Sequence, residues 1–239
     1  MSLSVMNERP DKRTLIITGC YWFVAFFLMP VFLLYLIYGL QDNIALSWVQ
    51  VCYYGINAVC TFFIYREHLA DSWLNFQIDK KKLLMTVLVC VGIFIVLFAW
   101  AFLLLRWLIP VEYALPVTEL ELLLMPTDFV DVNPVAGILT VVICTPLTVS
   151  CLLYGLGFAP ACNVHPLLGY GVLIAVLALH RKLNYYSVGT VELERLLFLL
   201  QLPGHLLACE TYRRTDSILA PILFHMILNL LSCLLILIF

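Results

Sequence analysis

The sequence predicts an all-α fold, a polytopic membrane helical bundle of about seven transmembrane helices, with a range of six to eight. Of its 239 residues, 64% are hydrophobic and 12% are charged, whereas soluble domains contain about 45–50% apolar and about 25% charged residues. The stretches 15–40, 44–65 and 83–100 contain no Asp, Glu, Lys or Arg. Each can cross a hydrocarbon core of about 30 Å as a helix of about 20 residues. A backbone in lipid must satisfy its own hydrogen bonds, and these runs lack the period-two alternation of a membrane barrel, so helices are expected.

The predicted spans follow one another with little polar sequence between them, which indicates one membrane domain over residues 1–239. They cover 15–40, 44–65, 83–108, 135–157, 167–181, 196–209 and 218–239. An eighth, interfacial helix is an alternative for 112–126. Segment 66–82 mixes apolar and charged side chains, so we expect its apolar face to lie on the membrane surface.

Basic residues predict the orientation of the chain. The short polar turn 41–43 makes the first two spans an antiparallel hairpin, so that positions 10 and 70 lie on one side. Both of these flanks are basic, and the loop 109–134 contains acidic residues but no Lys or Arg. By the positive-inside rule the N-terminus is cytoplasmic. Arg181 and Lys182 then fall outside, which conflicts with the rule unless one short span is re-entrant or the number of spans differs by one.

Composition also limits the partners. The net charge is −2 and there is no long basic stretch, so we expect no nucleic-acid partner. Membrane lipid is the partner that the apolar runs predict. The nine cysteines are odd in number and lack CxxC spacing. They are expected to be small buried apolar side chains, not disulfides or a zinc knuckle.

Polar side chains inside the predicted spans are the candidate functional residues, because ionisable groups are costly in a membrane. They include His180, His205 and His225. His225 and Asn229 are four residues apart, so on a helix they project from one face and can bind one ligand, metal or water together. An alternative is a zinc site made by the three histidines with an open fourth position. If they instead hydrogen-bond neighbouring helices, no cofactor is required.

The last span carries a resemblance to a known family. Thr215-Asp216-Ser217-Ile218 is followed by Pro221 and then by His225 and Asn229 in HxxxN spacing. This order resembles the end of the CAAX-protease and bacteriocin-processing (CPBP) family of intramembrane endopeptidases, in which a Thr-Gly-Ser-Leu-like turn precedes the same motif. The family includes the Ras-converting prenyl endopeptidase and bacterial bacteriocin self-immunity proteins. The similar core covers about residues 135–239.

Two further positions extend the resemblance. Gly204 stands where the family has a glycine in the helix that enters the turn. His180 aligns with the histidine of an FxxxH motif, in which Val176 replaces the phenylalanine. The resemblance therefore implies that His180, His225 and Asn229 occupy catalytic positions of the family.

The chain departs from the family at its first motif, EExxxR followed by glycine. The matching stretch, 149–155, reads Val-Ser-Cys-Leu-Leu-Tyr-Gly, so Val149 and Ser150 replace the two glutamates and the arginine is missing as well. In the family a glutamate activates the attacking water, while the histidines and the asparagine complete the site and hold the oxyanion. Without that base, the resemblance implies a degenerate, non-catalytic member that binds a peptide, a lipid or another membrane protein in a regulatory or immunity role.

Two other functions stay open. The first is an active endopeptidase of atypical site, which cuts CAAX-like or membrane peptides. Its carboxylate would come from Glu192 or Glu194, or from Glu119 or Glu121 in the acidic loop. The second is a small transporter subunit, which is disfavoured because the predicted spans contain no acidic residue and show no inverted repeat.

Overall fold

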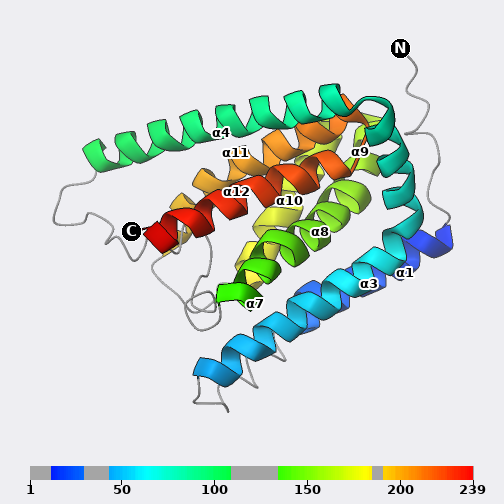
Figure 1. Cartoon of the computed structure of the whole chain (residues 1–239), viewed down its shortest axis with the longest axis horizontal. Coiled ribbons are helices and arrows are strands. Elements are labelled where there is room, and N and C mark those ends of the chain that lie inside the picture. Colours follow the sequence, from blue (N-terminus) through cyan, green and yellow to red (C-terminus); the bar gives the residue numbers. More distant parts are fainter. Residues whose placement is uncertain (1–11, 30–42, 109–133, 185–190, 239) are drawn as a thin grey trace.

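The computed structural model describes residues 12–29, 43–108, 134–184 and 191–238, and this part of the chain is helical and contains no strand. The all-α prediction is confirmed. Helices lie in each region where an apolar run predicted one (Figure 1). Residues 134–164 form one composite helix. The other helices are α1 (Lys12–Phe23), which continues into the π-helical η2 (Val24–Leu28), α3 (Asn43–Ile78), α4 (Lys80–Leu108), α10 (Pro166–Asn184), α11 (Val191–Thr215) and α12 (Leu219–Ile238). The predicted interfacial helix at 112–126 lies outside the described residues.

Residues 134–164 form a composite helix with two π-helical segments. Its consecutive segments are α7 (Pro134–Leu139), η4 (Thr140–Cys144), α8 (Thr145–Ser150), η5 (Cys151–Phe158) and α9 (Ala159–Val164). At the end of η4 the Thr145 N–H bonds the Thr140 carbonyl, and at the end of η5 the Ala159 N–H bonds the Tyr154 carbonyl. The next residue in each case is a proline, Pro146 or Pro160. Proline lacks an N–H, and a local change from α to π geometry is one way in which a helix accommodates it.

Two helical stretches among the described residues have the length and apolar composition needed to cross a membrane. They are Lys80–Ala101 on α4 and the composite helix Pro134–Val164. Two shorter apolar stretches are Pro166–Ala178 and Leu219–Leu234. The segments predicted at 167–181 and 196–209 belong to continuous helices of 19 and 25 residues. The segment between these two helices, 185–190, lies outside the described residues.

The helix α3 joins the predicted second span to the segment 66–82. It continues for 36 residues to Ile78, and Figure 1 shows its second half turning toward the start of α4. Leu69 and Phe76 pack against the main core, whereas Trp73 and Leu74 are exposed. The apolar side chains of 66–82 are therefore divided between the core and the outer surface, instead of forming the single membrane-facing surface that the sequence predicted.

Aromatic hydroxyl groups connect α1 to α3 and show that the two helices are antiparallel. The Tyr21 hydroxyl lies 3.0 Å from the Asn57 backbone carbonyl and 2.8 Å from the Asn57 Oδ1. The Tyr53 hydroxyl donates to the Ala25 carbonyl. The bonded residue numbers increase along α1 and η2, from 21 to 25, while those of their partners on α3 decrease from 57 to 53. This is the antiparallel arrangement predicted for the first two helices.

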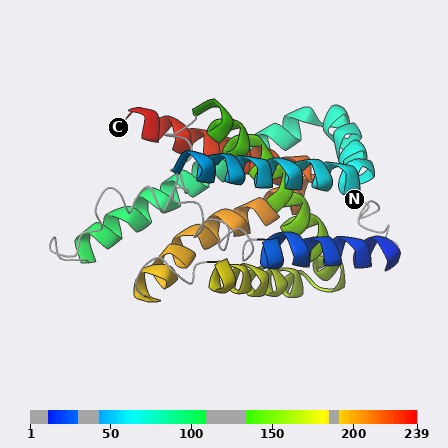
Figure 2. The same ribbon diagram turned by 90° about the horizontal axis from the view of Figure 1, so that it is seen from below.

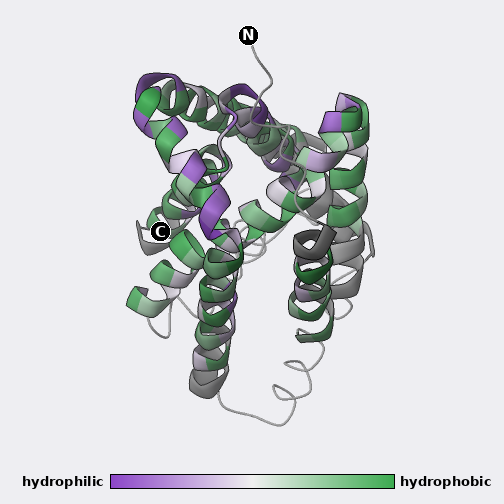
Figure 3. Cartoon of the chain, turned by 90° about the vertical axis from the view of Figure 1, so that its right-hand side faces the viewer, coloured by the Kyte–Doolittle hydropathy of each residue, from purple (hydrophilic) through white to green (hydrophobic). Residues whose placement is uncertain are grey.

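The main core lies where α4, α10, α11, α12 and η5 meet. Its largest fully buried side chains are those of Tyr154, Phe158, Phe224, Leu173 and Ile218. Figure 2 shows α1 lying beside α10 at one side of this bundle, and η2 contacts α10. Hydrophilic residues gather at the end where α3 meets α4 (Figure 3).

The turn between α11 and α12 docks on α3 at this hydrophilic end. The Ile218 N–H donates to the Ser72 hydroxyl at 3.2 Å, and the Ser217 hydroxyl donates to the Ser72 carbonyl at 3.3 Å. The Asn75 amide donates to the Asp216 carbonyl at 3.4 Å. Asp216 has φ 53°, in the left-handed region that glycine enters most easily and that Asp tolerates better than most residues. These contacts fix where α12 begins relative to α3.

Candidate functional site

Three polar side chains from three helices converge inside the bundle. The Tyr154 hydroxyl of η5 lies 2.9 Å from Nδ1 of His205 on α11 and 2.7 Å from Nε2 of His225 on α12. The Tyr154 ring stacks on His225 with centroids 5.8 Å apart, and the two imidazole centroids are 5.4 Å apart. Tyr154 is 0% exposed, and both histidines are partly buried. We call these three residues the Tyr–His–His cluster.

Gly204 allows α11 to approach α4 closely beside this cluster. A Cβ at Gly204 would lie 3.1 Å from the Phe94 ring. Phe94 packs edge-on against Phe224 with ring centroids 6.3 Å apart, and Phe224 precedes His225 on α12. The cluster therefore has an apolar wall formed by α4 and α12, and it is held by helix packing instead of by a loop.

The hydrogen-bond pattern of the cluster is limited by the number of donors and acceptors that its three side chains carry. The Tyr154 hydroxyl has one proton and two lone pairs, and a neutral imidazole has one donor and one acceptor nitrogen. When the hydroxyl donates to one imidazole, it can accept only from a protonated nitrogen of the other. The tautomer of His205 is therefore coupled to that of His225 through one oxygen. This arrangement can pass a proton between helices or hold the helices together.

The structure assembles two of the three histidines proposed as zinc ligands. His205 and His225 meet, but both direct a ring nitrogen at the same phenolic oxygen. His180 lies on α10, and its side chain is outside the described residues. In the described part of the chain, no group of three or more His, Cys, Asp or Glu side chains is arranged to hold a metal ion.

Asn229 lies one helical turn from His225 and bonds the composite helix. Its side-chain amide donates to the Val141 carbonyl at 2.8 Å, and Asn229 is 6% exposed. In the i to i+5 register of η4, this carbonyl would accept from residue 146, which is a proline. Asn229 thus supplies the donor that Pro146 lacks.

The positions that match the family's first motif lie on α8 and η5. Val149 is partly buried, and Ser150 is 0% exposed. The Ser150 Oγ makes no hydrogen bond to the described residues. Tyr154 stands at the position of the motif's arginine, four residues after Ser150. Sequence reasoning missed Tyr154 because a tyrosine in an apolar run suggests an ordinary core residue; its place in the motif was the available signal.

The described carboxylate nearest in sequence to the cluster, that of Glu210, is already engaged. Arg213 donates two hydrogen bonds to it, both at 2.9 Å, Arg214 donates one at 2.7 Å, and the Tyr170 hydroxyl donates one at 3.1 Å. The hydrogen bonds from Arg213 are the largest cause that lowers the pKa of Glu210 to about 2. This carboxylate is therefore a poor proton acceptor.

The carboxylates proposed as replacement bases lie outside the part of the chain whose side chains the structure describes. Glu192 and Glu194 begin α11, and their side chains lie outside the described part, as do Glu119 and Glu121 entirely. Position 194 is eleven residues before His205 on the same helix, a rise of about 17 Å.

Comparison of the chain with protein-family models, with curated proteins and with solved structures finds no match.

Proposed function

We propose that the chain is a multi-pass membrane protein with the architecture of a CPBP intramembrane endopeptidase, that it has no proteolytic activity, and that it binds a peptide or another membrane protein. The observation that carries this proposal is the Tyr154 hydroxyl held between His205 and His225. A phenol and two imidazoles bond one another there, and the cluster does not include the carboxylate that a protease of this kind needs. A regulatory or immunity role follows from binding without cleavage.

The chemistry of the cluster favours binding over hydrolysis. A general base contributes about 10²–10⁴ to a rate, and it must accept a proton from the attacking water at neutral pH. A phenol, with an ordinary pKa of about 10, keeps its proton there. Each imidazole already uses a nitrogen toward that phenol. One ring nitrogen of each histidine is therefore committed to an interhelical contact, which leaves the cluster one unprotonated imidazole nitrogen and no carboxylate among its three members.

Three positions support the proposed architecture because each has a physical reason to be small or flexible. Asp216, at the position of a family glycine, has φ 53°. A Cβ at Gly204 would lie 3.1 Å from Phe94, and one at Gly155 would lie 3.3 Å from Tyr65. These are positions where the CPBP motifs also have glycine, so the local packing agrees with the resemblance.

The membrane location is supported by the two long apolar helices and by the distribution of charge. Lys80, Lys81 and Lys82 begin α4, and Arg213 and Arg214 lie in the last turn of α11, so both groups flank the turns at the hydrophilic end. By the positive-inside rule this end faces the cytoplasm together with the N-terminus. Cysteine labelling from either side of sealed vesicles tests this orientation: positions 10 and 75 should react from the same side, and reaction from opposite sides contradicts it.

A cleavage assay with metal analysis tests the absence of proteolysis. The purified wild type, reconstituted in lipid, should neither cut membrane-segment or CAAX-type peptides nor contain stoichiometric zinc. The variants His225→Ala and Tyr154→Phe should give the same background. Cleavage by the wild type that is lost in His225→Ala, and in Glu192→Ala or Glu194→Ala, would establish the atypical endopeptidase instead.

A photo-crosslinking amino acid tests binding at the cluster. We place it at Val149, a partly buried first-motif position on α8, and at Leu88, which is 56% exposed on α4, as the control. Added membrane-segment peptides should be captured more strongly from position 149. Equal capture at both positions indicates nonspecific partition into the bilayer and contradicts the proposed binding site.

Solute uptake into proteoliposomes would favour the alternative function, a small transporter subunit.

A further inference from the structure

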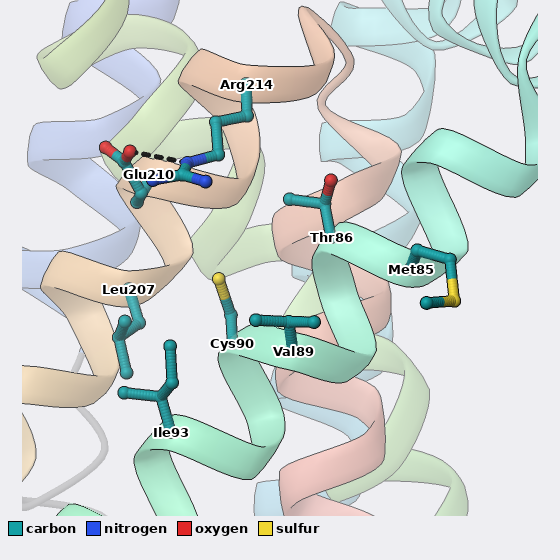
Figure 4. Close-up of a pocket in the computed structure, with 8 residues that line it drawn as sticks. All are labelled: Met85, Thr86, Val89, Cys90, Ile93, Leu207, Glu210 and Arg214. Atoms are coloured by element: carbon teal, nitrogen blue, oxygen red, sulfur yellow. Dashed lines mark hydrogen bonds and ion pairs between the residues drawn. The ribbon is translucent and has the colours of Figure 1, made fainter.

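A second candidate site lies between α4 and α11, and none of the three residues of the Tyr–His–His cluster lines it. It is a crevice with a volume of about 270 Å³ (Figure 4). Met85, Val89 and Ile93 border it and are 54%, 53% and 44% exposed. Cys90, which also lines it, is 5% exposed. The crevice is therefore open along the outer face of α4 and has a floor where α4 packs on α11.

The crevice is apolar at one end and charged at the other. Its α4 wall extends from Met85 to Ile93, a rise of about 12 Å. Leu207 and Ile93 line the apolar end, whereas Glu210 and Arg214 lie at the other end on α11 (Figure 4). The long axis follows α4, which contains the candidate membrane span Lys80–Ala101. A ligand that fits this shape has an apolar tail and a charged head.

The charged end has an excess of positive charge. One carboxylate, that of Glu210, binds both Arg213 and Arg214. Arg213 uses Nε and Nη2 for this contact, whereas Arg214 uses Nε. A guanidinium has five N–H donors, so the four on the terminal nitrogens of Arg214 make no bond to the described residues. The Arg214 side chain is 64% exposed, and these donors can reach a ligand.

The surrounding rim is also basic. Residues 79–82 and 210–217 contain five Lys and Arg against three Asp and Glu, and Lys80, Lys81 and Lys82 are exposed at the start of α4. Basic sites between helices on the cytoplasmic side of a membrane attract anionic lipid headgroups. Arg also suits phosphate, since its planar donors match the phosphate oxygens.

We propose that this crevice binds an anionic phospholipid, with its phosphate on Arg214 and one acyl chain along Val89, Ile93 and Leu207. A volume of about 270 Å³ is just below the usual range of about 300–1,000 Å³ for small-molecule pockets, so the crevice takes part of one chain. The rest of the lipid lies on the exposed apolar face of α4, which continues beyond the crevice at Leu97 and Trp100. The inference rests on the proposed membrane location and does not depend on the absence of proteolysis.

Native mass spectrometry of the purified full chain tests the lipid site. The protein is equilibrated with vesicles of equimolar phosphatidylglycerol and phosphatidylcholine with identical acyl chains, and the retained lipid is identified. Wild type should retain phosphatidylglycerol preferentially. Arg214→Gln should weaken that retention about fivefold, since it removes charge-assisted hydrogen bonds. Arg66→Gln, at a 68% exposed side chain on α3, is the matched charge control and should behave as wild type.

A second pair of variants tests the apolar part of the crevice. Val89→Trp should fill it and reduce phosphatidylglycerol retention, while Leu88→Trp, at the neighbouring exposed position, should not. Both replace an exposed side chain, so neither is expected to unfold the bundle, and thermal unfolding of each verifies this.

Several outcomes would overturn the lipid site. They are equal retention of both lipids by the wild type, equal behaviour of Arg214→Gln and Arg66→Gln, equal behaviour of Val89→Trp and Leu88→Trp, and binding of inorganic phosphate alone as tightly as phosphatidylglycerol. Alkaline extraction distinguishes this failure from failure of the proposed function. A chain that stays in the membrane fraction without lipid preference refutes only the lipid site, whereas a chain released into the soluble fraction refutes the membrane location.

Discussion

The side-chain amide of Asn229 donates to the backbone carbonyl of Val141, which lies 88 positions earlier in the chain, at 2.8 Å. The contact joins α12 to the π-helical segment η4 just before Pro146. The second residue of the HxxxN pair is thus connected by one hydrogen bond to the helix segment that precedes a proline. Asn229 has a reason to be in this sequence that does not depend on any reaction.

Asn229→Leu should lower the free energy of unfolding by about 1–3 kcal/mol, because it leaves the buried Val141 carbonyl without a donor. Pro146→Ala should reduce this cost, since residue 146 would then supply an N–H. Unfolding in mixed micelles of the two single variants and the double variant measures the coupling. Ser232→Ala, which removes a hydroxyl bond to the Leu228 carbonyl on its own helix, is the control and should cost less. Strict additivity of Asn229→Leu and Pro146→Ala would contradict the explanation.

Tyr154→Phe and Tyr65→Phe should have opposite effects on stability. The Tyr154 hydroxyl joins two histidines, so its loss should cost about 0.6–2 kcal/mol, the scale of interhelical hydrogen bonds in membranes. The Tyr65 hydroxyl is buried and makes no hydrogen bond to the described residues, so its removal should be neutral or stabilising. Melting temperatures in the same detergent measure both. Equal destabilisation by the two changes would indicate that the cluster's hydrogen bonds contribute nothing.

Gly169→Ala should destabilise the protein, whereas Gly171→Ala should not. A Cβ at Gly169 would lie 2.9 Å from the Cys162 Cβ and 3.1 Å from the Cys162 backbone nitrogen, so α9 and α10 would have to separate. A Cβ at Gly171 meets nothing within 4 Å, and alanine is favoured over glycine in a helix by about 0.5–1 kcal/mol. Unfolding of both variants tests the packing of α9 on α10. A stable Gly169→Ala variant would contradict the close approach.

Acid should weaken the hydrophilic end of the bundle through Glu210. Its pKa is lowered to about 2, first by the hydrogen bonds from Arg213. A carboxyl whose folded pKa is lowered stabilises the fold above its ordinary pKa and loses this contribution as the pH falls through the folded value. Between pH about 4.5 and about 2 we expect a loss of roughly 1–3 kcal/mol, reduced by solvent screening. Glu210→Gln should remove this part of the pH dependence, and Glu67→Gln, at an 88% exposed side chain, should retain it.

The positions of the helices could be predicted from the apolar runs, but their ends could not. The predicted second span stopped at residue 65, yet α3 continues through Arg66 and Glu67 to Ile78. Likewise α10 includes Arg181 and Lys182, and α11 includes Glu192 and Glu194. Lys, Arg and Glu have high helix propensity. A charge therefore ends an apolar run without ending the helix.

The candidate site could be predicted only in part, because its geometry depends on the register between distant helices. The sequence identified His205 and His225 as polar residues in spans, and these two do meet. It did not identify Tyr154, which is 51 positions from His205 and 71 from His225. No local pattern specifies which residues of three such helices face one another. The hydrogen bond from Asn229 to the Val141 carbonyl could not be predicted either, because it depends on how α12 packs against η4.

The docking of Ser72 against Ser217 and Ile218 also constrains the order of assembly during synthesis. The partners are separated by 145 and 146 positions, so the ribosome must complete α4, the composite helix, α10 and α11 before the contact can form. Until then the Ser72 hydroxyl and carbonyl lack the partners that the turn before α12 supplies. The turn that leads into the last helix therefore holds one of the first helices in place, and a chain truncated before residue 217 would lack both hydrogen bonds.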